Sequence, residues 1–99
     1  MRPLHWATMD KRRPVLVLTR ERLVGAMSTV TVAPVSSTRQ GLSTEIEVGP
    51  RNGLGRASVV KCDQIMSIPV ARLGEHCGWL LQSQEAELRD AIHAAFDLT

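Results

Sequence analysis

The run VVKCDQI at residues 59–65 constrains the fold most strongly, because it combines a strand-like apolar pattern with two charged side chains. Lys61 and Asp63 lie two positions apart, so in an extended strand both project from one face while their apolar neighbours project from the other. The runs at residues 12–18 (RRPVLVL) and 30–37 (VTVAPVSS) also place apolar stretches beside groups that handle anions or protons. We therefore expect short strands whose polar edges converge on one site.

The length and composition limit the size of that site. A chain of 99 residues is expected to form one domain with a modest core, which favours a surface groove over a large internal cavity. Its longest aliphatic run, residues 15–18, is far too short to span a membrane, and no secretion-type apolar segment follows the N-terminus. Cys62 and Cys77 have no partner at metal-ligand spacing. The sequence thus predicts a soluble cytoplasmic protein without a metal or another cofactor.

The net charge of +2 hides an uneven distribution along the chain. Residues 1–61 carry ten Lys or Arg and four acids, whereas residues 62–99 carry two Lys or Arg and six acids. A basic first part that faces a polyanion fits a nucleic-acid surface. A second interpretation is that the acids keep a terminal helix soluble, and both interpretations can hold together.

The apolar pattern predicts a mainly β fold. Residues 44–48 alternate, with Ile46 and Val48 expected to face inward and Glu45 and Glu47 outward. Other strands are expected at residues 4–8, 14–19, 28–35, 57–63, 64–69 beyond a kink, and 74–80, with a helical turn or two within residues 20–26. The β content is expected to dominate.

The end of the chain changes to helical periodicity. Leu88 and Ile92 begin an apolar series at helical spacing. Ser83 is the expected N-cap, and Glu85 precedes Arg89 by four residues, which is the favourable order for an ion pair along a helix. The sequence therefore predicts one C-terminal amphipathic helix.

Two polar clusters stand next to predicted strands. Lys11, Arg12 and Arg13 precede Pro14, and a residue before proline is held extended, so Arg13 should present its guanidinium at the start of a strand, in a form suited to bidentate contact with phosphate. The hydroxyls of residues 36–38 (SST) follow another strand and are placed to donate to a phosphate or ribose oxygen. Taken separately, the first cluster also fits a solvated basic turn, and the second fits local turn bonds to the backbone.

The aromatic and histidine residues give weaker signals. Trp6 and Trp79 lie on predicted strands, so we expect them in the core rather than stacked on nucleobases. His5, His76 and His93 show no mutual spacing that is typical of a metal site or of acid–base chemistry.

The blocks RRPVLVL, VTVAPVSSTRQGL, TEIEV and VVKCDQI, taken together in this order and spacing, resemble the MazF/Kid (PemK) family of toxin endoribonucleases. The resemblance covers most of the chain from Trp6 onward. It implies a mainly β (α+β) fold, an SH3-like small barrel of the MazF/Kid/CcdB type with a C-terminal amphipathic helix, and a single toxin domain over residues 1–99. It also implies metal-independent, sequence-selective cleavage of single-stranded RNA by 2′-hydroxyl attack, which leaves a 2′,3′-cyclic phosphate and a 5′-hydroxyl.

The resemblance also implies roles for particular residues. The family's arginine before proline falls on Arg13, and its strand-end hydroxyl falls on Ser36, where many members have threonine. The polar pair of the fourth block falls on Lys61 and Asp63, and Asp63 is the expected base or substrate-positioning carboxylate. The catalytic residues are thus predicted to be Arg13, Ser36 and Asp63, and the RNA-binding residues to be Lys11, Arg12, Ser37, Thr38, Arg39, Lys61 and Gln64. Base choice is expected to depend on the loops at residues 38–42 and 49–56.

The expected partners follow from the same resemblance. They are single-stranded RNA, a second copy of the chain in a homodimer, and a cognate MazE-like antitoxin whose disordered acidic and apolar segment covers the RNA groove. DNA is expected to be met only through the antitoxin complex, and no membrane is involved. The alternative function is a non-catalytic small-barrel binding module or a CcdB-type toxin that poisons DNA gyrase by protein contact. Arg13 together with Ser36 discriminates between these functions, because binding alone does not require a phosphate-directed pair at strand ends.

Overall fold

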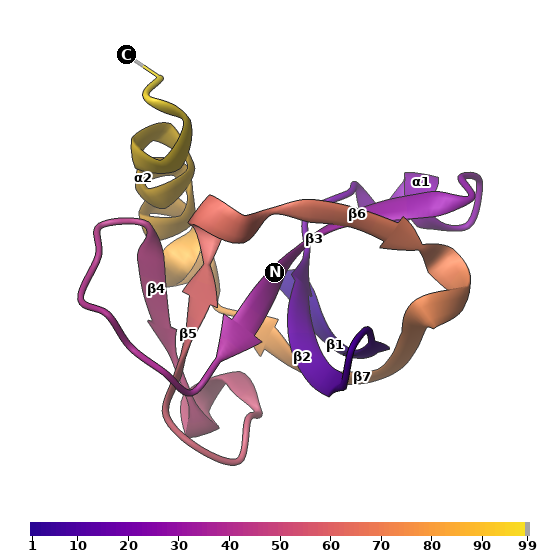
Figure 1. Ribbon diagram of the computed structural model, residues 1–99, viewed down its shortest axis with the longest axis horizontal. Helices are drawn as coiled ribbons and strands as arrows, with labels where there is room; N and C mark the ends of the chain where they lie inside the picture. Colours follow the sequence, from indigo (N-terminus) through magenta and orange to yellow (C-terminus); the bar gives the residue numbers. More distant parts are fainter. Residues whose placement is uncertain (99) are drawn as a thin grey trace.

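A computed structural model describes residues 1–98 of the chain (Figure 1). Its strands are β1 (Arg2–Thr8), β2 (Arg12–Val17), β3 (Thr29–Ser36), β4 (Glu45–Val48), β5 (Ser58–Lys61), β6 (Met66–Pro69) and β7 (Leu73–Leu80). Its α-helices are α1 (Glu21–Val24) and α2 (Glu85–Phe96). Four 3-10 turns join them, namely η1 (Pro50–Asn52), η2 (Cys62–Gln64), η3 (Val70–Arg72) and η4 (Gln82–Gln84).

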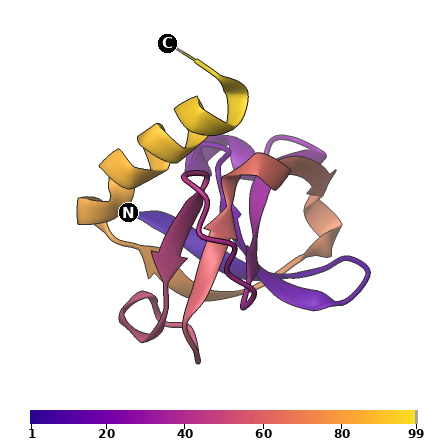
Figure 2. The same cartoon turned by 60° about the vertical axis from the view of Figure 1, so that its left-hand side comes forward.

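The strands form one antiparallel sheet that curls into a half-barrel (Figures 1 and 2). The order across the sheet is β4-β5-β3-β2-β1-β7, and β6 also pairs with β3. On one side β3 pairs with β2, and on the other it pairs first with β6 and then with β5. Pro34, which has no N–H to donate, lies between the β6 and β5 ladders, so a proline is tolerated in a central strand. The prediction of a mainly β small barrel with a C-terminal helix is confirmed.

Strand β2 is buried on both faces, as its continuous aliphatic pattern predicts. Leu16 belongs to a core that α2 covers with Leu88 and Ala91. Val15 and Val17 belong to a second core, which includes residues of β1, β3 and β6. All three β2 side chains are at most 2% exposed. The strand that carries Arg13 at its start is thus fixed from both sides.

The terminal helix differs from its prediction in two details. It begins at Glu85 after the 3-10 turn η4, so Ser83 is not its N-cap. The expected Glu85–Arg89 pair does not form, because Glu85 is 3.2 Å from the Nε of Arg2 at the start of β1, and Arg89 is 3.9 Å from Asp90. Glu85 therefore pairs with Arg2, which is distant in the sequence, instead of with Arg89 on its own helix.

Two strand-face predictions are wrong. Strand β5 ends at Lys61, and Asp63 lies in the following turn η2, so the two residues do not share a strand face. Glu45 was expected to face outward, yet its side chain is only 3% exposed. Ile46 and Val48 face inward and Cys62 is fully buried, as their apolar character requires.

Neither tryptophan lies fully in the core. Trp79 is 40% exposed and packs its ring at 4.4 Å from that of His76, while Trp6 is half-buried. The core prediction is therefore wrong for Trp79 and holds only in part for Trp6. Over residues 1–98, no helix has the length and apolar character that a membrane crossing requires.

Candidate active site

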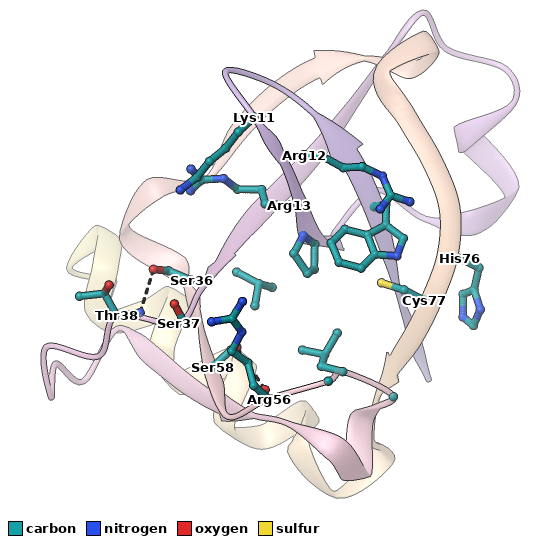
Figure 3. A pocket seen from close by; sticks show the side chains of 16 residues that line it. Lys11, Arg12, Arg13, Ser36, Ser37, Thr38, Arg56, Ser58, His76 and Cys77 are labelled. Atoms are coloured by element: carbon teal, nitrogen blue, oxygen red, sulfur yellow. Dashed lines mark hydrogen bonds between the residues drawn. The ribbon is translucent and has the colours of Figure 1, made fainter.

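A pocket of about 690 Å³ opens where the β1–β2 hairpin, the end of β3, the turn before β5 and the edge strand β7 meet (Figure 3). This volume lies within the roughly 300–1,000 Å³ range of pockets that hold small ligands. Its lining residues are Trp6, Lys11, Arg12, Arg13, Pro14, Val35, Ser36, Ser37, Thr38, Gly53, Leu54, Gly55, Arg56, Ser58, His76 and Cys77. Two of the three polar strand edges identified in the sequence, at the start of β2 and the end of β3, therefore do converge.

Arg13 enters this pocket from the start of strand β2. Its partner across the ladder is Ala7 of β1, and the following residue, Pro14, pairs with Trp6. The side chain is 25% exposed, and its Nη2 is 3.7 Å from a carboxylate oxygen of Asp10. Its Nε is buried and has no hydrogen-bond partner within residues 1–98. Arg13 thus keeps unused donor capacity at the pocket.

Ser36 reaches the same pocket from the last position of β3. Its Oγ accepts a hydrogen bond of 3.1 Å from the backbone N–H of Thr38. Because the oxygen is already an acceptor in this turn, its own hydrogen is free to point at another group, such as a phosphate oxygen. Figure 3 shows Arg13 and Lys11 on the side of the pocket that carries Ser36 and Thr38.

The pocket is strongly cationic. Lys11, Arg12, Arg13 and Arg56 line it, and the lining residues drawn from residues 1–98 include no aspartate or glutamate. Arg56 was missed at the sequence level, because it stands in a glycine-rich turn whose path cannot be read from local pattern. The only carboxylate paired with one of these cations in the described part of the chain is Asp10, whose side chain is 80% exposed.

The other side of the pocket is aromatic and apolar. The guanidinium carbon of Arg12 lies 4.3 Å from the centre of the Trp6 ring, a cation–π contact. Leu54 and Cys77 also line the pocket. Burial raises the pKa of the Cys77 thiol, and the nearby charge of Arg12 opposes that rise. The thiol is therefore protonated near neutral pH and does not supply a nucleophile there.

Lys61 was predicted to bind RNA, but the structure gives it an internal partner. Its Nζ is 2.7 Å from a carboxylate oxygen of Glu45 and 3.1 Å from Oε1 of Gln40. The same carboxylate accepts hydrogen bonds of 3.1 Å from the backbone N–H groups of Gln40 and Leu42. The hydrogen bond from Lys61, supported by these amides against the opposing effect of burial, lowers the pKa of Glu45 from 4.5 to about 2. This cluster anchors the loop that follows Ser36.

The remaining predicted residues lie outside the pocket lining. Asp63 and Gln64 are exposed on η2, a turn that contacts α2. Arg39 forms an exposed ion pair of 2.7 Å with Glu47. Among residues 1–98 there is also no group of three or more His, Cys, Asp or Glu side chains arranged to hold a metal ion.

The fold and the pocket together define a small curled-sheet protein with a cationic, hydroxyl-bearing pocket suited to a phosphate ester. Residues 5–96 match the family described as PemK-like, MazF-like toxin of type II toxin-antitoxin system, and the chain belongs to this family.

Individual relatives agree with this assignment. Endoribonuclease MazF3 of Mycobacterium tuberculosis is 53% identical over 98 residues, which cover 99% of this chain and 95% of the relative. The solved structure of the Mycobacterium tuberculosis toxin MazF-mt6 superimposes with a TM-score of 0.96 at 52% identity, over 99% of both chains. A mycobacterial endoribonuclease solved in complex with its cognate antitoxin shares the fold, with a TM-score of 0.85 at 18% identity over 98% of this chain and 93% of that one.

Proposed function

We propose that this MazF-type endoribonuclease cleaves single-stranded RNA in the pocket formed by Arg13 and Ser36. The observation that carries the proposal is the convergence of these two side chains, from the start of β2 and the end of β3, on one pocket. Among the described residues, no acidic side chain lines that pocket. The phosphodiester gains negative charge in the transition state. The hydroxyl of Ser36 and the unused N–H donors of Arg13 can offset that charge.

The proposed reaction is an internal transesterification. The ribose 2′-oxygen forms a bond to phosphorus while the bond from phosphorus to the 5′-oxygen breaks, which gives a 2′,3′-cyclic phosphate and a 5′-hydroxyl. Arg13 offsets the charge of the phosphorane and donates a hydrogen bond to the leaving 5′-oxygen, which takes its proton from solvent water. Ser36 donates a hydrogen bond to a non-bridging oxygen. An extended, unstacked strand is required, because the attack must be in line with the leaving group.

The position of Asp63 changes one part of the predicted mechanism. Its carboxylate was expected to act as base or to position substrate, but the residue is exposed on η2 and does not line the pocket. We therefore assign the proton of the 2′-hydroxyl to solvent water, leave Asp63 out of the catalytic set and leave Lys61 out of the RNA-binding set. Lys11 and Arg56 contribute positive charge along the path of the RNA backbone.

The partners proposed for the chain follow from its family. A protein antitoxin of the MazE type is expected to neutralise it by laying an acidic and apolar segment over the cationic pocket, where it competes with RNA. We also propose that residues 1–99 act as a single toxin domain in a homodimer, and that the protein meets DNA only through its antitoxin complex.

The test is an analysis of product ends. Purified protein is incubated with single-stranded RNA in excess chelator, and the fragment ends are identified by their reactivity with a 5′-kinase and a cyclic phosphodiesterase. Wild-type protein is expected to give 5′-hydroxyl and cyclic-phosphate ends, and Arg13→Ala to cut about 10²- to 10³-fold more slowly. Arg89→Ala, an exposed arginine on α2 outside the pocket, is the matched control and should keep the wild-type rate.

Other outcomes would overturn the proposal. Intact RNA that only shifts in mobility would support the non-catalytic binding module. Gyrase inhibition by protein that leaves RNA intact would support a CcdB-type toxin. Thermal unfolding of Arg13→Ala is measured in parallel, and a large drop would show that Arg13 supports the fold rather than the reaction.

A further inference from the structure

The two sides of the pocket differ in chemistry. The side with Arg13 and Ser36 offers charge and hydroxyl donors, whereas the side with Arg12 and Cys77 combines a cation with apolar surface (Figure 3). A phosphodiester requires only the first side. The pocket, at about 690 Å³, is also larger than one phosphate group needs. The second side therefore has room for another part of the substrate.

Arg12 is held in a defined position on this second side. Its guanidinium lies over Trp6 at 4.3 Å, and within residues 1–98 it has no carboxylate at ion-pair distance. A guanidinium fixed by an aromatic ring presents its N–H donors in a planar fork with little further loss of side-chain entropy. Arg12 is also exposed, so these donors face an incoming ligand rather than the core.

The surroundings of Arg12 fit a flat, partly apolar group. Leu54 and Cys77 give apolar wall, and Gly53 and Gly55 line the pocket without side chains. At Gly53 the backbone φ is +91°, and a Cβ would come within 2.7 Å of the carbonyl oxygen of Cys77. Gly53 therefore lets this turn pack directly against the backbone of β7. The wall of Leu54 and Cys77 beside Arg12 has the shape and polarity that suit a nucleobase.

We propose that Trp6, Arg12, Leu54 and Cys77 form a nucleobase subsite in which Arg12 selects the base next to the cleaved phosphate. The inference rests on the proposed function and extends it to substrate selection. A planar pair of donors is matched by two neighbouring acceptor atoms. Guanine offers such a pair at O6 and N7 and cytosine at O2 and N3, whereas adenine and uracil place a donor beside each acceptor on these edges. Guanine or cytosine is therefore the base that the subsite takes.

A binding selection with uncleavable RNA measures base preference separately from cleavage. A randomised single-stranded RNA pool with 2′-O-methyl riboses cannot undergo 2′-oxygen attack, so sequencing of the bound fraction reports binding alone. Wild-type protein is expected to enrich guanine or cytosine at one position by about 5- to 150-fold over adenine and uracil, the range that one bidentate contact gives. Arg12→Lys, which keeps the charge and loses the fork, should abolish that enrichment, and Trp6→Phe should reduce it.

Lys11→Ala is the matched control, because Lys11 neighbours Arg12 and carries a charge without a fork. It should weaken binding for all sequences alike and leave the base preference intact. A wild-type pool without base preference, or an Arg12→Lys pool with the wild-type preference, would overturn the subsite. Base-selective binding by protein that leaves unmodified RNA intact would overturn the proposed function alone, so the two failures are distinguishable.

Discussion

Two charged regions of this molecule use similar side chains in opposite ways. In the cluster of Lys61 and Glu45, the side chains are 7% and 3% exposed, and the charges are 2.7 Å apart. In the pocket, Arg12 and Arg56 have no ion-pair partner within the described residues, and Arg13 has only an exposed aspartate at 3.7 Å. The first region satisfies its charge internally. The second leaves its charge for a ligand.

Whether a charged side chain supports the fold or remains available to a ligand depends here on its partner rather than on its residue type. A buried ion pair is stable only when further hydrogen bonds satisfy it, and the amides of Gln40 and Leu42 do this for Glu45. Because these amides belong to the loop after Ser36, the satisfied cluster also steadies the chain beside the unsatisfied one.

Ser36→Ala should reduce RNA cleavage by about 10- to 100-fold, since it removes one hydrogen bond to a charged phosphate group. Ser36→Thr keeps the hydroxyl and should keep most of the rate. Cleavage rates at saturating RNA measure the effect, with Ser83→Ala, which changes an exposed serine of turn η4, as a control outside the pocket. Equal rates for Ser36→Ala and wild type would remove Ser36 from the reacting site.

Lys61→Met should destabilise the fold more than any single replacement of a pocket cation, because it leaves the buried Glu45 carboxylate without its counter-charge. Urea unfolding of Lys61→Met and Arg12→Ala compares the two regions directly. If both variants unfold at the same urea concentration, the buried pair does not hold the loop as described.

The stability of the protein should fall in acid through Glu45. Its pKa is lowered from 4.5 to about 2 in the folded state, so the ionised carboxylate favours folding above pH 4.5, and this contribution is lost as the pH falls from about 4.5 to about 2. Unfolding midpoints over this range measure the loss. Glu45→Gln should flatten that part of the profile, and an unchanged slope in the variant would assign the acid sensitivity to other groups.

Arg39→Ala should change stability by less than about 1 kcal/mol, since its pair with Glu47 is 56% and 68% exposed. The small effect should shrink further in high salt, where exposed charges are screened. Urea unfolding at two salt concentrations checks both statements. A cost that equals that of Lys61→Met would contradict the contrast between buried and exposed pairs.

Local sequence patterns were sufficient for much of the fold, and together with the family resemblance they singled out Arg13 and Ser36. The aliphatic run of β2 predicted burial on both faces, and the proline after Arg13 predicted an extended arginine at a strand start. The hydroxyl of Ser36 was predicted at a strand end, and β3 does end there. These features depend on period and on neighbouring residues, which a sequence displays directly.

The sequence-based predictions failed where contact with a distant segment determines whether a side chain is buried. Glu45 and Lys61 are opposite each other in the ladder between β4 and β5, a register that turned two apparently outward charges into a buried pair. Trp79 was predicted to lie in the core, yet its ring is 40% exposed and packs on His76, whereas the neighbouring Leu80 is fully buried.

Residue patterns alone predicted short strands with a terminal helix, and a guanidinium and a hydroxyl at two strand ends. The folded arrangement was needed to show that Arg56, Trp6 and Cys77 complete the pocket and that Asp63 does not line it. The physical reason is that strand period and proline geometry act over a few residues, whereas burial and charge pairing depend on which distant segments the curled sheet brings together.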